Sequence, residues 1–514
     1  MASESSTSNS HRRISELVRH AVSDVPDKVW LIAEDTEWTY AESLRRIERG
    51  ASWLRGTGVG PGDRVLVVAR NTPDFLVTWL ALMEVGAIYV PVNPNSSLAE
   101  IAGFLRQVEP MVIVVDGDLA TQARVTTLEV GSQAVVADVN SLFKNEADGQ
   151  RPADVGPDDI AVMMPTSGTT GRSKLVMQSH RAYVMAGEGF PFWMQLRSDD
   201  RLMTSLPLFH VNALAYSTLG SLSARASLVL LPGFSANGFL DSARHYEATE
   251  FNSIGAMLEI LMRQPEKPDD ADNPLRRCYT GPSPDRERHL AIERRFGIDI
   301  VCGYGLSEST YGLIWPHGSR PFGTLGAARQ HPTLGHVNDA RVCDVSEDGI
   351  GELALRNPTL MSGYYKMPEE TDQVLVDGWL RTGDLATENS DGTFTFVGRR
   401  KEVIRRRGEN LSPTEVESAL EQHPDVAEAA VIGVESDLSE EDVKAFLVPV
   451  AGRQIDIGGL DSLARERLAR FKVPRYYELI TELPHTPTGR LAKHGLPKER
   501  TPGEIDIENG ADSV

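Results

Sequence analysis

The sequence predicts an α/β protein with a large N-terminal body of mixed, partly parallel sheets and a smaller C-terminal α+β domain. Short apolar runs, such as residues 64–69 and 112–115, alternate with helical stretches such as 75–85. This alternation is typical of strands joined by helices, and therefore of parallel sheets. A chain of 514 residues is also too long for one ordinary core, which favours two or more domains.

The large body is expected to span residues 24–400. Apolar runs predict further strands at 160–164, 227–231 and 299–302. After residue 349 the segments become shorter and are separated by Gly, Asp and Asn, which predicts a small antiparallel β unit over 349–400.

The C-terminal domain is expected to span residues 401–500, with its boundary near Lys401. A basic run is followed by an expected helix at 413–423, a strand at 429–434 and a helix at 460–471. This order is that of a compact α+β domain. The acidic segment 501–514 is poor in apolar residues and is expected to be a disordered tail.

The amino-acid composition limits the classes of protein to which the chain can belong. Residues 1–23 are expected to be disordered or peripheral, and the polar first thirteen residues show no secretory signal or anchor. No segment approaches the length of a membrane span. The formal net charge of −21 opposes non-specific binding to nucleic acid or to anionic membranes. Three widely spaced cysteines predict no disulfide framework or metal site, so a cytoplasmic location is the simpler expectation.

A loop rich in small and hydroxylic residues follows the expected strand at 160–164. Successive backbone N–H groups can form an anion nest there, and a lysine adds a point charge. The loop differs from a Walker loop, which ends in Gly-Lys-Ser/Thr and opens a helix. Its composition also fits a flexible linker, but its position after an apolar strand favours a phosphate site. The candidate phosphate-binding residues are Thr166, Ser167, Gly168, Thr169, Thr170, Gly171 and Lys174.

Further motifs follow in a fixed order along the chain. They are Pro207-Leu208-Phe209-His210-Val211-Asn212, Gly281-Pro282-Ser283, Gly303-Tyr304-Gly305-Leu306-Ser307-Glu308-Ser309, Gly378-Trp379-Leu380-Arg381-Thr382-Gly383-Asp384 and Gly398-Arg399-Arg400-Lys401-Glu402, with Arg407-Gly408-Glu409-Asn410 downstream. Together with the phosphate loop, they resemble the adenylate-forming superfamily of acyl-CoA synthetases, amino-acid adenylation domains and luciferases. The resemblance covers nearly the whole chain. In the phosphate loop, Ser173 stands where the family usually has proline.

The resemblance implies an adenine site and a metal site. Tyr304 would stack on adenine, with the backbone of Gly281, Pro282 and Ser283 on the other side of the base. Glu308 would bind a magnesium ion that bridges phosphates, and Ser307 would lie within reach of the α-phosphate. Each residue taken alone would be an ordinary turn tyrosine or a solvated glutamate.

The resemblance also assigns the ribose and the channel residue. Asp384 would accept both ribose hydroxyls, and Arg399 would donate to the same sugar. His210 resembles the family histidine that gates the acyl and thiol channels. Taken alone, Asp384 would be a turn former and His210 a packed core residue.

The implied reaction has two halves. A carboxylate attacks the α-phosphorus of ATP to give an acyl-adenylate, and the thiol of CoA then displaces AMP. The small domain would rotate about a hinge at Lys401, bringing the Gly408 region to the pantetheine path. The basic cluster around Arg405 would attract the CoA phosphates, although a solvated basic loop is an equal alternative.

One departure from the family pattern concerns the first half-reaction. The family ends with Thr-Gly-Lys, and its lysine bridges the substrate carboxylate and the α-phosphate; here the match is Thr488-Gly489-Arg490. Arginine keeps the charge but is planar and forked. Either Arg490 is tolerated in a complete ligase, or the chain only converts a supplied acyl-adenylate, which implies a separate adenylating enzyme as partner. An inactive adenylate-binding protein is a third reading. Lys493 is a candidate substitute.

The substrate is expected to be a bulky hydrophobic acid. By family analogy the acyl pocket lies near 252–258, 279–281, 303–306 and 311–315. These segments contain several small residues, which would leave room for a ring-bearing acid: Gly255, Ala256, Gly281, Gly303 and Gly312. The sequence leaves the oligomeric state open, a homodimer included.

Overall fold

The structure is a computed structural model, and it describes residues 13–96, 98–166, 174–281, 283–333, 335–400, 402, 404–406, 409–436, 441–468, 472–485 and 491–507. The chain divides into two compact units. The first unit contains the residues up to 340 together with 355–381. The second contains 341–354 together with the residues from 382 onward.

Two large sheets form the frame of the first unit. The nine-stranded sheet has the order β15 (Ala327–Ala328), β14 (Ser309–Ile314), β13 (Asp299–Leu306), β12 (Arg277–Thr280), β11 (Glu250–Asn252), β9 (Arg201–Thr204), β10 (Ser227–Leu230), β1 (Val29–Ala33) and β2 (Thr36–Thr39). The seven-stranded sheet has the order β20 (Gly363–Tyr364), β8 (Lys174–Ser179), β7 (Ile160–Thr166), β4 (Ile88–Val92), β3 (Arg64–Val68), β5 (Val112–Val115) and β6 (Val135–Asp138).

Both sheets are mixed, as the sequence predicts. The strands from β13 to β1 in the first sheet run parallel, and β14 and β2 are antiparallel to their neighbours. In the second sheet β4, β3, β5 and β6 are parallel, and β7 and β8 form an antiparallel pair. The predicted α/β body is therefore confirmed.

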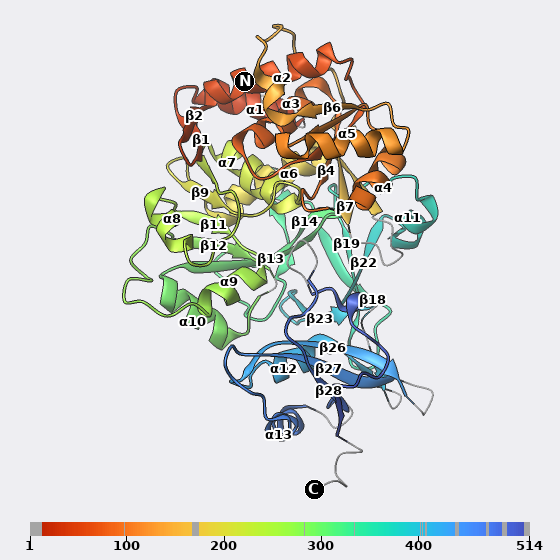
Figure 1. Ribbon diagram of the computed structural model, residues 1–514. Helices are drawn as coiled ribbons and strands as arrows, with labels where there is room; N and C mark the ends of the chain where they lie inside the picture. Colours follow the sequence, from red (N-terminus) through yellow and green to blue (C-terminus); the bar gives the residue numbers. More distant parts are fainter. Residues whose placement is uncertain are drawn as a thin grey trace. The chain divides into compact units, whose positions relative to one another are not determined.

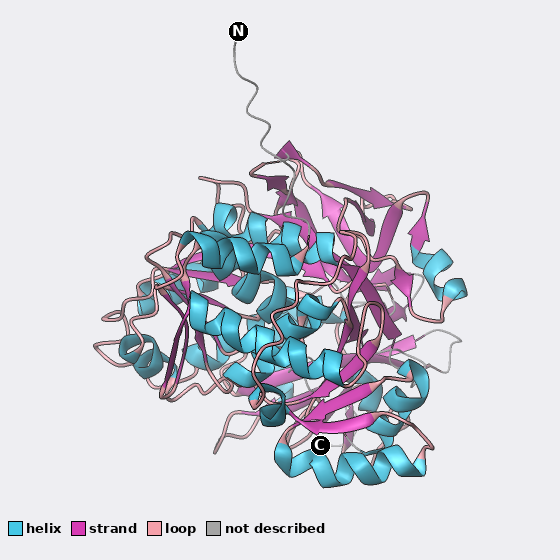
Figure 2. Ribbon diagram, turned by 90° about the horizontal axis from the view of Figure 1, so that it is seen from above, coloured by secondary structure: helices cyan, strands magenta, loops and turns pink. Residues whose placement is uncertain are grey.

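Helices connect and cover these strands (Figures 1 and 2). Their bounds are α1 (Ile14–Asp24), α2 (Tyr40–Gly56), α3 (Pro73–Val85), α4 (Leu98–Val108), α5 (Ala120–Glu129), α6 (His180–Met194), α7 (Leu219–Ala224), α8 (Phe239–His245), α9 (Gly255–Met262), α10 (Arg286–Phe296) and α11 (Pro368–Val374). A π-helix, η3 (Asn212–Thr218), precedes α7. Within the described ranges, no helix is both long enough and apolar enough to span a membrane.

Helix α3 illustrates how the sequence sets these elements. The side chain of Thr72 caps the first turn by accepting a hydrogen bond from the backbone N–H of Phe75, and Pro73 occupies the first helical turn. The helix ends at Gly86, which adopts the left-handed conformation with φ of 70°. All residues from 75 to 85 are buried, so the helix lies inside the core with no polar face.

Shorter strands follow the first unit's sheets in the sequence. A five-stranded sheet has the order β18 (Asp339–Cys343), β19 (Gly351–Arg356), β22 (Trp379–Glu388) and β21 (Leu375–Val376), with β23 (Phe394–Arg399) also paired to β22. The β22 and β23 pair is antiparallel, which fits the predicted antiparallel texture of this region.

The second unit contains a small α+β domain, as predicted. Its four-stranded sheet has the order β26 (Val426–Glu435), β27 (Glu441–Pro449), β28 (Tyr476–Leu479) and β29 (Glu504–Asp506), accompanied by α12 (Pro413–Leu420) and α13 (Ile457–Arg467). Successive side chains of β27 point to opposite faces of the sheet, and this explains how the strand packs. Val443 and Ala445 join one core cluster that includes Leu460 of α13, whereas Phe446 joins a cluster on the opposite face.

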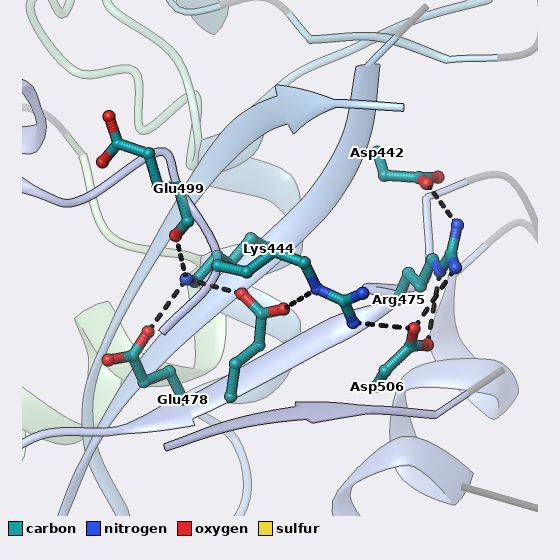
Figure 3. Close-up of polar contacts among 8 residues, drawn as sticks. Asp442, Lys444, Arg475, Glu478, Glu499 and Asp506 are labelled. Carbon is teal, nitrogen blue, oxygen red and sulfur yellow. Dashed lines mark hydrogen bonds and ion pairs between the residues drawn. The ribbon is translucent and has the colours of Figure 1, made fainter. Parts of the chain in front are cut away.

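A buried lysine ties the edge of this sheet together. Lys444 of β27 is fully buried, and its Nζ lies 2.9 Å from Oε2 of Glu478 (Figure 3). The same Nζ lies 2.7 Å from Oε2 of Glu504. It also donates to the backbone oxygen of Glu499 at 3.3 Å. A buried ammonium needs such partners because burial removes its hydration.

An arginine extends the same network. Arg475 contacts Asp442 at 2.8 Å and Asp506 at 3.2 Å (Figure 3). Glu504 and Asp506 thus link β29 to β27 and to the start of β28. The expectation of a disordered tail from residue 501 does not hold for residues 504–506, because their two carboxylates neutralise buried or half-buried cations.

The N-terminus also differs from the expectation. Residues 14–24 form α1, and Ile14, Leu17, Val18 and Ala21 lie in the main core. Their spacing of three and four residues places them on one face of the helix. The polar segment before Arg13 and the hinge at Lys401 lie outside the described residues, so the hinge stays a prediction.

Replacing Lys444 with Met should destabilise the second unit by roughly 3–5 kcal/mol, because it removes the buried cation from Glu478 and leaves Glu504 with only the exposed Arg500. The matched control is Lys472→Met, which removes an ion pair with the more exposed Glu415, and it should cost less than about 1 kcal/mol. Hydrogen exchange of β27 peptides in the full chain, measured over increasing urea concentration, gives the local stability. Equal losses in the two variants would contradict the structural role of Lys444.

Candidate active site

Four of the predicted segments of the first unit follow or end strands at one edge of the nine-stranded sheet. Strands β9, β11, β12 and β13 are parallel neighbours, so their carboxyl ends share that edge. The segment with His210 follows β9, Asn252 ends β11, Gly281 follows β12, and Tyr304 lies near the end of β13. The carboxyl edge of parallel strands is where open α/β sheets bind ligands.

The backbone that carries His210 is fixed by buried polar contacts. The side chain of Asn71 donates to the oxygen of Leu206 at 2.9 Å and accepts from the N–H of Leu208 at 2.9 Å. The hydroxyl of Tyr89 donates to the oxygen of Leu208 at 3.1 Å. The ring of His210 lies 4.7 Å from that of Phe209, measured between centroids. Two residues later η3 begins, and such wide π-helical turns are frequent at functional sites.

Close strand packing explains the small residues near Tyr304. A Cβ on Gly281 would lie 2.3 Å from the oxygen of Gly303, and one on Gly312 would lie 2.2 Å from the oxygen of Tyr304. A Cβ on Gly303 would lie 2.8 Å from the hydroxyl of Tyr279. These three glycines therefore do not open space for a bulky acid, because protein atoms already fill it. Gly255 and Ala256 lie at the start of α9.

Strand β13 extends further than the sequence predicted. It continues from the expected 299–302 to Leu306, because it pairs with the antiparallel β14. Leu306 pairs with Ser309, so Ser307 and Glu308 form the two-residue turn of a hairpin. The register shifts between Tyr304 and Leu306, and such irregularities re-aim side chains beside functional sites.

Two side chains outside the predicted motifs hold this turn. Nε2 of Gln178, on β8, donates to the oxygen of Ser307 at 2.7 Å. The hydroxyl of Tyr364, on β20, donates to Oε1 of Glu308 at 3.0 Å. The backbone N–H of Met361 donates to the oxygen of Glu308 at 2.8 Å. The hairpin turn of the first sheet is therefore attached to the second sheet.

Tyr364 also contacts the end of the predicted phosphate loop. Thr166 and Lys174 pair across β7 and β8, and Nζ of Lys174 lies 4.3 Å from the centroid of the Tyr364 ring. Burial raises the pKa of the Tyr364 hydroxyl, and the charge of Glu308 acts in the same direction, so the hydroxyl stays protonated and donates. The structure thus brings Lys174 and Glu308 to the two sides of one tyrosine.

These groups fit a magnesium ion held mainly by substrate. Within the described residues, no three His, Cys, Asp or Glu side chains are grouped as a metal site. Magnesium in phosphate-transfer sites uses one or two carboxylates together with phosphate oxygens and water. A carboxylate in the position of Glu308, near the lysine at the end of the phosphate loop, meets that requirement.

The predicted ribose residues lie together in the second unit. Asp384 on β22 and Arg399 on β23 are register partners, and Nε of Arg399 lies 3.2 Å from Oδ1 of Asp384. The Asp384 side chain is buried, with 3% of its surface exposed. The N–H of Gly383 donates to Glu352 at 2.9 Å and so fixes the turn before it.

Part of the basic cluster has carboxylate partners inside the second unit. Nη1 of Arg400 lies 2.8 Å from Oε2 of Glu352, and Nε of Arg406 lies 3.0 Å from Oδ1 of Asp442. Arg406 is also buried, with 4% of its surface exposed. Arg406 therefore has a structural role, and Arg405 is described only as the backbone of β24 (Ile404–Arg406), which pairs with β25 (Glu409–Leu411).

Lys493, the candidate substitute for the family lysine, is held within the second unit. Its Nζ lies 2.7 Å from Oε1 of Glu417 and 3.5 Å from Oε2 of Glu402. Burial raises the pKa of the Glu417 carboxyl, and the Lys493 ammonium opposes this shift. An exit of Lys493 would leave a buried carboxyl without its cation.

The remaining predicted residues lie outside the described part of the chain: Ser167, Gly168, Thr169, Thr170, Gly171, Pro282, Lys401, Gly408 and Arg490. Ser283 follows β12, and its hydroxyl accepts from the N–H of Gly323 at 3.3 Å. The sequence reasoning missed Gln178, Tyr364 and a buried arginine, Arg329. The paired tyrosines after Gly363 were a signal for an aromatic contact, whereas nothing local distinguishes Gln178 or Arg329.

Comparison with known proteins places both units in one family. The AMP-binding enzyme family matches residues 18–365, and the AMP-binding enzyme C-terminal domain matches residues 415–490. A crotonobetaine/carnitine--CoA ligase from Salmonella paratyphi B is 32% identical over 504 residues, covering 91% of this chain and 96% of the relative.

Solved structures agree with this assignment. ATP-bound MatB from Rhodopseudomonas palustris superposes with a TM-score of 0.84 at 28% identity, covering 93% of this chain and 97% of that one. The o-succinylbenzoate coenzyme A synthetase MenE from Bacillus subtilis, in complex with AMP, has a TM-score of 0.84 at 25% identity, covering 95% and 99%. The chain therefore belongs to the AMP-binding enzyme family, as an acyl-CoA synthetase of the adenylate-forming superfamily.

Proposed function

We propose that this protein is an acid:CoA ligase that makes an acyl-CoA thioester from a carboxylic acid, ATP and CoA by way of an acyl-adenylate. The observation that carries the proposal is the contact of Tyr364 with both Lys174 and Glu308. It joins the lysine at the end of the phosphate loop to the carboxylate assigned to the metal. Both groups act on the same polyphosphate in this reaction.

In the first half-reaction the chain binds and orients ATP. Lys174 supplies a positive charge to the phosphates, and Glu308, oriented by Tyr364, would hold magnesium. The ion, when bound, neutralises phosphate charge. Tyr304 is assigned to adenine, and Asp384 with Arg399 to the ribose. Positioning and charge neutralisation supply most of the catalysis in such a step.

In the second half-reaction CoA thiol attacks the acyl carbonyl and AMP leaves. We assign His210 to the gate between the acyl and thiol channels. Asn71 and Tyr89 hold the backbone just before it, at Leu206 and Leu208, which supports a positioning role. Rotation about Lys401, with the Gly408 loop entering the pantetheine path, is the conformational change proposed between the halves.

Because Arg490 replaces the family lysine, the proposal has two versions. In the first reading, Arg490 serves in place of the family lysine and both half-reactions occur. In the second, the chain only forms the thioester from an acyl-adenylate made by a separate adenylating enzyme. The contact of Lys493 with Glu417 argues against Lys493 as the substitute. An inactive adenylate-binding protein is the third reading, and the joint presence of His210, Asp384 and Arg399 opposes it.

We also propose that the acid is bulky. The argument now rests on aromatic side chains and no longer on the small residues of the pocket segments. Aromatic side chains surround the carboxyl ends of β12 and β13, and the rings of Phe190 and Tyr216 stack with centroids 5.6 Å apart. Tyr279 meets Tyr216 edge-on at 5.4 Å. These three side chains are buried against one another, and an acid that reached this region would meet flat apolar rings. The relatives' names include carnitine and benzoate ligases, so the acid itself does not carry over from them.

The two half-reactions can be measured separately. A panel of bulky, aryl and fatty acids is offered with CoA, either as free acid with ATP and magnesium or as preformed acyl-adenylate. We expect acyl-CoA in both arms by mass spectrometry. Product from the adenylate arm alone would assign the second half-reaction only, and product from neither arm would contradict the ligase function.

Replacing Arg490 with Lys restores the family residue and tests its effect directly. If the forked guanidinium limits adenylation, Arg490→Lys should raise the free-acid rate by about 100-fold while leaving the adenylate arm unchanged. The control is Arg467→Lys on the exposed end of α13. An unchanged or lower free-acid rate would show that Arg490 already serves the first step.

Replacing Tyr364 with Phe keeps the ring against Lys174 but removes the hydroxyl that orients Glu308. We expect kcat/KM for ATP to fall by about tenfold, the value of a hydrogen bond to a charged group. The neighbouring Tyr365→Phe is the control, because the Tyr365 ring contacts Lys366 instead. Equal effects of the two variants in steady-state kinetics would refute the role of Tyr364.

A further inference from the structure

A buried arginine lies among the proposed acyl-binding segments. Arg329 follows β15, and only 2% of its surface is exposed, which is rare for so large a charged side chain. The proposed function does not use this residue. A guanidinium is always protonated, so its burial places a full positive charge in the core.

The contacts of Arg329 are to neutral groups. Its Nε donates to the oxygen of Leu313 at 3.0 Å, and its Nη2 donates to the hydroxyl of Tyr279 at 2.9 Å and to the oxygen of Tyr304 at 3.5 Å. The guanidinium carbon lies 5.6 Å from the centroid of the Tyr216 ring and 5.4 Å from that of Tyr311. Three tyrosines and two carbonyls therefore surround the charge.

Within the part of the chain that the structure describes, no carboxylate balances this charge. Among the described residues, no ion pair involves Arg329, and no hydrogen bond from its Nη1 is found. Burying a charge without a counter-charge is costly, so buried arginines are normally paired. Arg295 shows the usual solution in the same unit: its Nε lies 2.8 Å from Oδ2 of Asp270, and its other nitrogens bind backbone oxygens.

The location of Arg329 points to the substrate. Its partners lie on β12, β13, β14 and η3, and the first three of these elements carry segments that the family resemblance assigns to the acyl pocket. A Cβ on Gly303 would lie 3.0 Å from Nη2 of Arg329, so the guanidinium occupies the space in front of this glycine. Gly303 directly precedes Tyr304, the residue assigned to adenine. The charge therefore lies beside the expected position of the acyl-adenylate.

We propose that Arg329 binds a second carboxylate of the acyl substrate, distant from the carboxyl group that is activated. The inference rests on the proposed ligase function and names its substrate class, a bulky dicarboxylic acid. Nε and Nη2 are already used, so the two N–H groups of Nη1 would donate to the oxygens of that carboxylate. The tyrosine rings would hold the apolar part of the same acid. An acid with a quaternary ammonium group is excluded by like-charge repulsion.

The test compares matched acids that differ only at the far end. Straight-chain and aryl acids of increasing length are offered with a terminal methyl, carboxamide, carboxylate or trimethylammonium group, and kcat/KM is measured for acyl-CoA formation. We expect the carboxylate member to exceed the methyl member by at least about tenfold, with the carboxamide between them. A methyl or carboxamide member equal to the carboxylate would overturn the inference.

Variants of Arg329 separate recognition from folding. Arg329→Met should remove the carboxylate preference while the methyl acids are still converted, and Arg329→Lys should keep part of the preference. Arg295→Met is the control, a buried arginine whose loss should lower the unfolding temperature but leave the preference unchanged. Arg329→Met could instead lower kcat/KM for all acids by the same factor and unfold at the same temperature as Arg295→Met. That result would assign Arg329 a purely structural role.

A binding measurement keeps this inference distinct from the ligase function. Acyl sulfamates of adenosine, stable analogues of acyl-adenylates, are titrated into the protein by calorimetry without ATP or CoA. We expect the analogue with a terminal carboxylate to bind at least about tenfold more tightly than its methyl counterpart, and Arg329→Met to remove the difference. Such a result would support the inference even if no acid gave acyl-CoA. Equal affinities would overturn it even if ligase activity is present.

Discussion

The hairpin turn at Ser307 and Glu308 is the constraint on which the site in the first unit depends. It extends from the nine-stranded sheet, yet Gln178 and Tyr364 of the seven-stranded sheet hold it. Because the phosphate loop leaves the second of these sheets, the same contacts set where Glu308 lies relative to Lys174. A shift between the two sheets would separate the two charges that the proposed function assigns to one polyphosphate.

Glycine serves close packing in this region. Gly281, Gly303 and Gly312 each lie where a Cβ would meet a backbone oxygen or a tyrosine hydroxyl within 2.8 Å. Small residues in a family pocket can thus reflect strand spacing as much as substrate size. In front of Gly303 the space holds the side chain of Arg329, a residue that lies outside the predicted motifs.

Much of the fold follows from local patterns. The apolar runs at 64–69 and 112–115 became β3 and β5, and the helix expected at 75–85 became α3. Lys174, Glu308, Asp384 and Arg399 could be named as candidate site residues because their motifs are continuous in the chain. Tyr364, Gln178 and Arg329 could not be, since each acts through a contact between segments far apart in sequence. The sequence did not predict the ordered segments at 14–24 and 504–506. Segment 14–24 is polar overall but has one apolar face, and segment 504–506 is held by two carboxylates whose cations lie elsewhere in the chain.

The Lys444 network has a consequence for how the second unit forms. Strand β27 carries its buried ammonium into the sheet, but the carboxylates that neutralise it arrive later in the chain, first Glu478 and then Glu504. During synthesis, β26 and β27 can pair as a hairpin well before this charge is fully compensated. The sheet therefore gains its full stability only after β29 has emerged from the ribosome, and until then the ammonium of Lys444 retains its water.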